Sequence, residues 1–132
     1  MTWPKKHKYG AKRTLYNLRW YASKLEAEYA AHLDSLKSAA KLSERVSRWE
    51  SQIPLPLIVC GSKIGTFVCD YLVHYADGRK VYVEVKGYPT PVWRLKEKLF
   101  RALYPDLTLI VVGSGMRERT SKPRRTTARR RK

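Results

Sequence analysis

Residues 70–86, DYLVHYADGRKVYVEVK, contain the signals that decide the fold. Two strand-like runs, 64–75 and 79–86, flank the short loop 76–78 (ADG). A polar loop with glycine between two apolar, β-branched runs predicts a β-hairpin. We therefore expect two adjacent antiparallel strands, with the acidic and basic residues of this stretch brought close to one another.

The length of the hairpin loop determines which side chains can meet. A two-residue turn would place Asp70 opposite Val85, on the wrong face of the sheet for Glu84. A three-residue loop would place Asp70 opposite Glu84, because side chains alternate across a strand. Gly78 suits the left-handed position that a three-residue loop requires. We predict the three-residue loop.

The hairpin would then bring two carboxylates and a lysine together. Glu84 and Lys86 project from one face of their strand, and the neighbours of Asp70 on its face, Val68 and Leu72, are apolar. A buried carboxylate without a partner is costly, so Asp70 needs a cation. The structural alternative is a salt bridge from Asp70 to Lys86, with Glu84 facing solvent. The functional interpretation is a site for one divalent metal ion and one activated water.

A helix of about 17 residues is predicted to begin at Ser23, with the sequence SKLEAEYAAHLDSLKSA. Ser23 is a favourable N-cap, and Glu26 three residues later completes a capping-box pattern. Helical spacing predicts a buried stripe along one face, formed by Leu25, Tyr29, Leu33, Leu36 and Ala40. Glu26 lies on this buried face, whereas Glu28 is expected to be exposed, so Glu26 is the preferred candidate for the site.

The remaining elements complete an α/β pattern. Residues 14–21 predict one or two short strands around Asn17, and 53–61 (IPLPLIVCG) predict a strand whose two prolines indicate an edge. A second helix is predicted at 91–104, with Thr90 and Pro91 as its first residues, followed by a buried strand within 107–112. We expect a restriction-endonuclease-like α/β core, with a central mixed β-sheet flanked by helices.

The charge indicates a polyanionic partner. The chain has 132 residues and a net charge of +17. Residues 1–114 carry 19 Lys and Arg against 10 Asp and Glu, while residues 115–132 carry 9 against 1. We divide the chain into a basic arm (1–13), one domain (14–114) and a basic tail (115–132) expected to be disordered. Nucleic acid is the expected partner, since no amphipathic face accompanies the charge as membrane binding would require.

The sequence gives no signal for export or for a thiol-based site. No apolar run reaches the ~18 residues of a membrane-spanning helix, and no apolar segment follows the basic N-terminus. Cys60 and Cys69 lack metal-ligand spacing and are expected to be reduced, small core residues. We therefore expect a cytoplasmic location.

These motifs together resemble a known superfamily. A helix glutamate, Asp70 and then Glu84-Val85-Lys86 look like the PD-(D/E)XK nucleases, which include restriction enzymes, phage endonuclease I and archaeal-type Holliday-junction resolvases. The segments KYGAKRT, SKLEAEYA and DYLVHYADG through VEVKGYPTPVWRLKEKLF resemble more closely a family of small phage-encoded proteins assigned to this fold. The resemblance covers residues 8–112, and Cys69 stands where the proline of the motif would be.

The resemblance implies specific roles. Asp70 and Glu84 would bind Mg²⁺ or Mn²⁺ together with the Val85 backbone carbonyl, Lys86 would orient or activate the attacking water, and Glu26 would complete the metal shell. The implied activity is a metal-dependent DNA endonuclease that hydrolyses phosphodiester bonds, structure-selective for branched DNA in phage replication or recombination. A symmetric junction would require a homodimer, and a phage protein would act in the host cytoplasm. The alternative is a non-catalytic nucleic-acid-binding protein that retains the fold.

Contacts with DNA are expected from the second helix and from the basic termini. Tyr88 and Trp93 flank the site loop and are candidates for stacking on a base, with core packing the alternative for Trp93. Gln52 is a further candidate for lining the site. The basic residues expected to contact DNA are Lys8, Lys12, Arg13, Arg94, Lys96, Lys98, Arg101, Arg124, Arg125, Arg129, Arg130 and Arg131.

Overall fold

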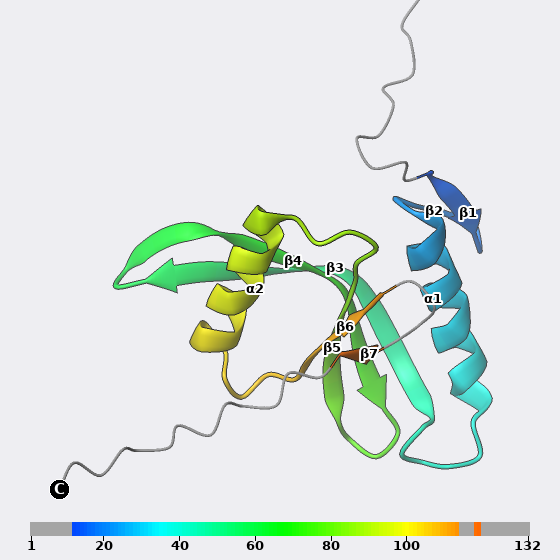
Figure 1. Cartoon of the computed structure of the whole chain (residues 1–132). Coiled ribbons are helices and arrows are strands. Elements are labelled where there is room, and N and C mark those ends of the chain that lie inside the picture. The colour runs from blue at the N-terminus through cyan, green and yellow to red at the C-terminus, as the bar shows by residue number, and fades with distance from the viewer. Residues whose placement is uncertain (1–11, 114–117, 120–132) are drawn as a thin grey trace, which may run out of the picture.

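The computed structural model describes residues 12–113 and 118–119. Its elements, in chain order, are β1 (Thr14–Tyr16), β2 (Arg19–Tyr21), α1 (Lys24–Ser35), the 3₁₀ turn η1 (Leu36–Ser38), β3 (Val46–Val59), β4 (Ser62–Tyr75), β5 (Lys80–Val85), α2 (Pro91–Leu103), β6 (Leu109–Val112) and β7 (Glu118–Arg119). Strands β3-β4-β5-β6-β7 form a mixed sheet in that order, and β1-β2 form a separate hairpin. The predicted α/β fold with a mixed sheet and flanking helices is confirmed, and it is consistent with a restriction-endonuclease-like core (Figure 1).

The first helix begins as the sequence predicts and ends earlier. The backbone N–H of Glu26 donates to Ser23 Oγ at 3.2 Å, which satisfies one of the free amides of the first turn. Tyr29 and Leu33 are buried, but the α-helix stops at Ser35. Ala40, predicted to belong to the buried stripe, lies beyond the 3₁₀ turn and is exposed, because the chain leaves the helical path there.

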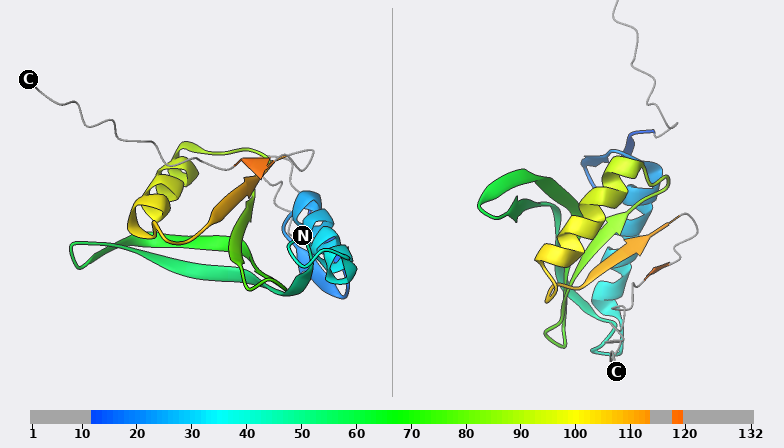
Figure 2. Two further views of the ribbon diagram at one scale, coloured as in Figure 1. Left: turned by 90° about the horizontal axis from the view of Figure 1, so that it is seen from below. Right: turned by 60° about the vertical axis from the view of Figure 1, so that its left-hand side comes forward.

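Strands β3 and β4 form a long hairpin whose side chains contribute to two hydrophobic clusters. Tyr71 and Val73 of β4 pack with α1, whereas Phe67 and Cys69, four and two residues before Tyr71, pack with α2. The far half of the hairpin extends past β5 and lies along α2 (Figures 1 and 2). Where the packing partner changes, Gln52 of β3 has a φ of +55°, an unusual value inside a strand.

The edge position of β3 agrees with its two prolines, as expected. Of the two cysteines, Cys69 is buried as predicted, but the prediction of a core position for Cys60 is wrong. Cys60 has a φ of +48° and forms, with Gly61, the two-residue turn between β3 and β4. A residue in the turn at the far end of a hairpin is exposed to solvent, because no other element of the described ranges packs over it.

The chain returns to the sheet through α2. Thr90 Oγ1 accepts a hydrogen bond from the Trp93 amide at 3.2 Å, and Pro91 occupies the first turn, as predicted. Strand β6 then pairs parallel to β5. Neither helix of the described ranges is long and apolar enough to cross a membrane.

The predicted terminal segments lie mostly outside the described residues. Of the basic arm, the structure describes Lys12 and Arg13, both exposed. Of the predicted disordered tail, it describes Glu118–Arg119, which form the strand β7 antiparallel to β6. The sheet therefore extends to Arg119, past the domain boundary that we placed at residue 114.

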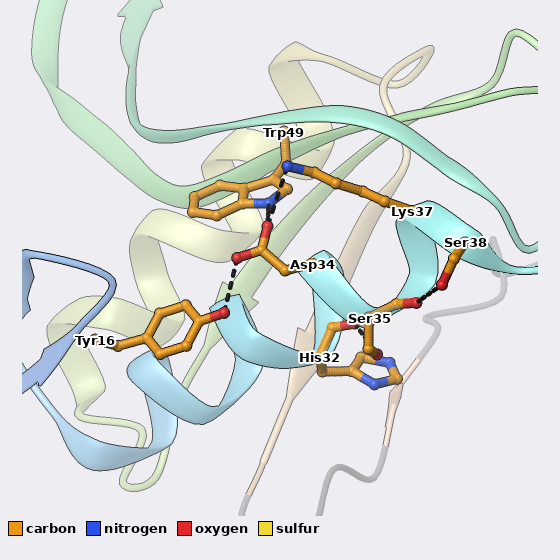
Figure 3. Close-up of polar contacts among 7 residues, drawn as sticks. All are labelled: Tyr16, His32, Asp34, Ser35, Lys37, Ser38 and Trp49. Carbon is orange, nitrogen blue, oxygen red and sulfur yellow. Dashed lines mark hydrogen bonds and ion pairs between the residues drawn. The ribbon is translucent and has the colours of Figure 1, made fainter.

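Asp34 anchors the β1–β2 hairpin to the rest of the protein (Figure 3). The Tyr16 hydroxyl of β1 donates to Asp34 Oδ2 at 2.8 Å, and the Trp49 indole of β3 donates to Oδ1 at 2.8 Å. Lys37 lies 3.2 Å from the same carboxylate. Burial alone would raise the pKa of Asp34, but the bonds from Trp49 and Tyr16, with Lys37, hold it below its usual value. One ionised carboxylate of α1 thus ties together two strands.

We expect Asp34→Asn to lower the melting temperature at neutral pH, because the hydrogen bonds to a charged acceptor weaken. Since the folded pKa of Asp34 is depressed, its contribution is present above about pH 4 and is lost as pH falls through the folded value. Thermal unfolding from pH 3 to 7 measures this. The exposed Asp106→Asn is the matched control. A constant difference across this range would contradict the assignment.

The turn of the β1–β2 hairpin contains backbone strain. Asn17 and Leu18 have φ values of +47° and +62°, and the Leu18 side chain is 96% exposed. Asn-Gly is the favoured pair for such a turn, so we expect Leu18→Gly to stabilise the protein by about 0.5–1 kcal/mol. Urea unfolding measures the change, with Leu15→Gly in the adjacent strand as the control that should destabilise. A loss of stability in Leu18→Gly would show that the leucine makes a compensating contact.

Candidate active site

The register between β4 and β5 is the predicted one. Tyr71 pairs with Val83 and Val73 with Val81, so that continuation by one residue sets Asp70 opposite Glu84. The loop has three residues: the Tyr75 amide donates to the Arg79 carbonyl at 2.9 Å, and Gly78 has a φ of +94°. The hairpin prediction, and the shared face that depends on it, are confirmed.

At this point the two carboxylates replace backbone carbonyls as hydrogen-bond acceptors. The Val85 amide donates to Asp70 Oδ2 at 2.8 Å, and the Asp70 amide donates to Glu84 Oε2 at 3.3 Å. The backbone pairing of β4 and β5 ends one residue earlier, at Tyr71 and Val83. The side chains of Asp70 and Glu84 therefore lie together where the two strands begin to separate.

Helix α2 contributes to the same site through Trp93. Its indole N–H donates to Glu84 Oε1 at 3.2 Å, and the Lys86 ammonium lies 5.6 Å from the centre of its ring. The ring also packs on the cluster of buried residues beneath α2, so the core-packing alternative for Trp93 holds. Trp93 contacts both Glu84 and Lys86, a role that no pattern in the sequence predicts.

Glu26 approaches the site from α1. Burial raises its pKa to about 7, with the negative charge of Asp70 adding to the effect, while the Ser23 hydroxyl and the charge of Lys86 act against it. Burial and the charge of Asp70 likewise raise the pKa of Glu84 to about 8, and Glu84 is only 6% exposed. Burial also raises the pKa of Asp70. Three carboxyl groups therefore lie close enough to interact with one another and with the charge of Lys86.

Gln52 reaches the site from β3. Ser51 pairs with Tyr71 and Ile53 with Cys69, so Gln52 stands opposite Asp70 in the same row as Glu84. Its amide lies 3.4 Å from Asp70 Oδ1, a long hydrogen bond. The strained φ of Gln52 thus falls beside the candidate site, where backbone strain often occurs.

Two open depressions meet at Glu26. The first, which we call the hairpin pocket, has a volume of about 330 Å³, and its walls include Arg13, Arg19, Trp20, Glu26, Gln52 and Tyr71. The second, the lysine groove, has a volume of about 720 Å³, and its walls include Lys12, Lys24, Glu26, Val85, Lys86 and Tyr88. Arg13 and Glu26 line both depressions, which therefore adjoin each other beside the site.

A family model matches residues 6–118, described as a protein of unknown function, DUF1064. The chain belongs to the DUF1064 family. No curated protein and no solved structure matched the chain. The site of this DUF1064 protein must therefore be judged on its own geometry.

The structure separates the basic residues expected to contact DNA. Lys12, Arg13, Arg94 and Lys98 are exposed, and Lys96 is half-buried beside Gly65. The Arg101 side chain makes hydrogen bonds inside the protein: its guanidinium donates to Glu97 at 3.1 Å and to the Leu109 carbonyl at 3.4 Å. The remaining predicted contacts lie outside the described residues: Lys8, Arg124, Arg125, Arg129, Arg130 and Arg131.

Sequence reasoning missed two residues of the hairpin pocket, Arg19 and Trp20. Both are exposed on β2 beside Glu26 and Gln52. The available signal was the run NLRWY, in which Arg and aromatic residues adjoin within a short strand. Such interleaving is typical of surfaces that bind single-stranded nucleic acid.

We expect Glu84→Gln to stabilise the metal-free protein at high pH. The folded pKa of Glu84 lies above its unfolded value, so its contribution is fully present below about pH 4 and is lost as pH rises through about 8. Glutamine has no charge to bury. The melting temperature of the Glu84→Gln variant, measured as a difference from that of the wild type, should therefore rise between pH 5 and 9. The exposed Glu28→Gln is the control and should show no such trend. A parallel pH dependence of Glu84→Gln and wild type would contradict the burial of the charge.

Proposed function

We propose that this protein is a metal-dependent DNA endonuclease of the PD-(D/E)XK type. The observation that supports this most strongly is the placement of Asp70 opposite Glu84, with Lys86 on the same face as Glu84 and Glu26 close by. Elements distant in sequence bring these four groups together, and a salt bridge between Asp70 and Lys86 would not need a second and a third carboxylate beside it.

The donor set fits Mg²⁺ or Mn²⁺. Burial raises the pKa of Glu26, Asp70 and Glu84, which means that the folded protein holds these charges poorly without a cation. Among the described residues, no group of three His, Cys, Asp or Glu side chains lies close enough together to hold a metal ion, so the proposal takes only Asp70 and Glu84 as side-chain ligands. Two adjacent carboxylates with the Val85 carbonyl suit Mg²⁺, which keeps several of its waters rather than entering a closed protein cage.

When bound, such an ion lowers the pKa of a coordinated water and stabilises negative charge on the phosphate oxygens. Asp70 and Glu84 would hold it, with the Val85 carbonyl as a further ligand, and Glu26 would act from the outer shell. The Lys86 ammonium lies 5.6 Å from the centre of the Trp93 ring. It would orient the attacking water or stabilise the charge that develops on the phosphate. In hydrolysis the water oxygen bonds to phosphorus and loses a proton, while the bond from phosphorus to the leaving oxygen breaks and that oxygen takes up a proton.

The substrate is proposed to be DNA. The net charge of +17 and the lysines of the groove beside Val85 and Lys86 favour a phosphate backbone. Activity on branched DNA in phage replication or recombination, in the host cytoplasm, and a homodimer for symmetric junctions are the finer parts of the proposal. They rest on the resemblance to small phage nucleases.

We expect Asp70→Asn and Lys86→Ala each to abolish Mg²⁺-dependent cleavage, because one removes a ligand charge and the other the cation beside the phosphate. Glu26→Gln should reduce cleavage at least tenfold, whereas Glu28→Gln on the same helix should leave it unchanged. Cleavage of labelled junction, duplex, flap and single-stranded DNA, with Mg²⁺ and with Mn²⁺, measures this. DNA binding in EDTA should remain within a few-fold of wild type in all four variants.

Two results would decide against the proposal. Retained cleavage in both Asp70→Asn and Lys86→Ala would refute the site. A wild-type protein that binds all four DNAs and cuts none, with either metal, would be a non-catalytic nucleic-acid-binding protein that retains the fold.

A further inference from the structure

We propose that the hairpin pocket binds an unpaired nucleotide of the substrate, with Trp20 stacking on the base and Arg13 and Arg19 contacting phosphates. This inference rests on the proposed nuclease function, and it narrows the substrate class to DNA with single-stranded character next to the cleaved bond. It assigns a role to the β1–β2 hairpin, which lies outside the main sheet.

The location of the pocket is the first argument. Glu26 and Gln52 form part of its wall, and both lie at the candidate site: Gln52 donates to Asp70 at 3.4 Å, and the charge of Asp70 acts on Glu26. A nucleotide in this pocket would therefore adjoin the phosphate at Asp70 and Glu84. The volume of about 330 Å³ is that of a small-molecule site.

The chemistry of the wall is the second argument. Trp20 is 58% exposed, and the Arg13 guanidinium lies 5.3 Å from the centre of its ring. The Arg19 guanidinium lies 5.8 Å from the centre of the ring of Tyr21, two residues later, which is buried in the core beneath α1. Trp20 is therefore the exposed ring, and guanidinium groups lie beside it; such a surface suits a single strand, since every unpaired base offers a flat face and every linkage a phosphate.

A fully paired duplex would use this surface poorly. Its bases already stack on their neighbours, so the face of an indole ring can replace none of those contacts without unstacking a base pair. Duplex DNA would still contact Arg13 and Arg19 through its phosphates, but these contacts do not depend on Trp20. Dependence on Trp20 therefore distinguishes an unpaired nucleotide from general attraction to DNA.

The hairpin is held in place before any substrate arrives. Tyr16 of β1 is bonded to Asp34 of α1 at 2.8 Å, and α1 also bears Glu26 (Figure 3). A binding surface already fixed loses less entropy when it captures a ligand.

Binding in EDTA, where no cleavage occurs, tests the proposal with the full-length protein. Fluorescence anisotropy would be measured on three DNAs of equal length: a duplex, the same duplex with a short single-stranded gap, and a single strand. We expect Trp20→Ala to weaken binding of the gapped and single-stranded DNAs about tenfold and of the duplex less than twofold. Trp20→Phe, which keeps a flat ring, should retain most of the binding.

A charge-matched pair tests the arginines. Arg19→Ala should weaken binding of the gapped DNA more than Lys63→Ala does, although both remove one positive charge from an exposed position. Lys63 lies at the far end of the β3–β4 hairpin, away from both depressions. Thermal unfolding of each variant shows whether the protein stays folded. If Trp20→Ala does not fold, the binding of Trp20→Phe to the three DNAs is compared with that of the wild type instead.

The outcomes separate this inference from the proposed activity. An equal effect of Trp20→Ala on all three DNAs, or no effect, overturns the nucleotide pocket even if the wild-type protein cuts DNA. A selective loss on gapped and single-stranded DNA supports the pocket even if no DNA is cut with Mg²⁺ or Mn²⁺, in which case the nuclease activity alone fails. Equal losses in Trp20→Phe and Trp20→Ala would also contradict stacking.

Discussion

The separation of β4 from β5 at Asp70 and Glu84 is the constraint on which the rest of the structure depends. As far as Tyr71 and Val83 the strands are paired, and beyond that point the two carboxylates accept the amides of Val85 and Asp70. A shift of one residue in this pairing would move every side chain of β5 to the other face. The three-residue loop ending at Gly78 prevents that shift. At ~3.3 Å per residue, this loop lies about 15 Å or more from Glu84 along the strand, and it nevertheless determines which side chains meet at the site.

The site works against the stability of the metal-free fold. Glu84 is almost fully buried, and burial raises the pKa of all three carboxyl groups near Lys86. Ionising such groups costs folding free energy unless a cation compensates for it. A protein selected for stability alone would replace Glu84 by an apolar residue that fills the space beneath Trp93. The arrangement is physically sensible if a divalent cation is bound during function, and that requirement is the link between the geometry and the proposed activity.

The sequence predicted those features that depend on local chemistry. The register followed from one loop and one glycine, and the start of each helix followed from Ser23 and from Thr90 with Pro91. It did not predict contacts between distant segments. The change of packing partner along β4 and the strained φ of Gln52 depend on how α1 and α2 divide the sheet, which no short window of sequence contains. The role of Trp93 was equally inaccessible, because an aromatic residue on a helix fits core packing as well as a hydrogen bond to a carboxylate.

Helix α1 explains why the site and the hairpin pocket belong to one unit. Glu26 in its first turn faces Asp70, and Asp34, eight residues later, holds Tyr16 of the hairpin and Trp49 of β3. Eight residues of helix span about 12 Å, so the two contacts lie two turns apart on one rigid element. A displacement of α1 would move the Glu26 carboxylate and the hairpin together relative to the sheet. The position of a bound nucleotide and the position of the third carboxylate are therefore set by the same packing of α1 against Tyr71 and Val73, and a change in that packing alters both.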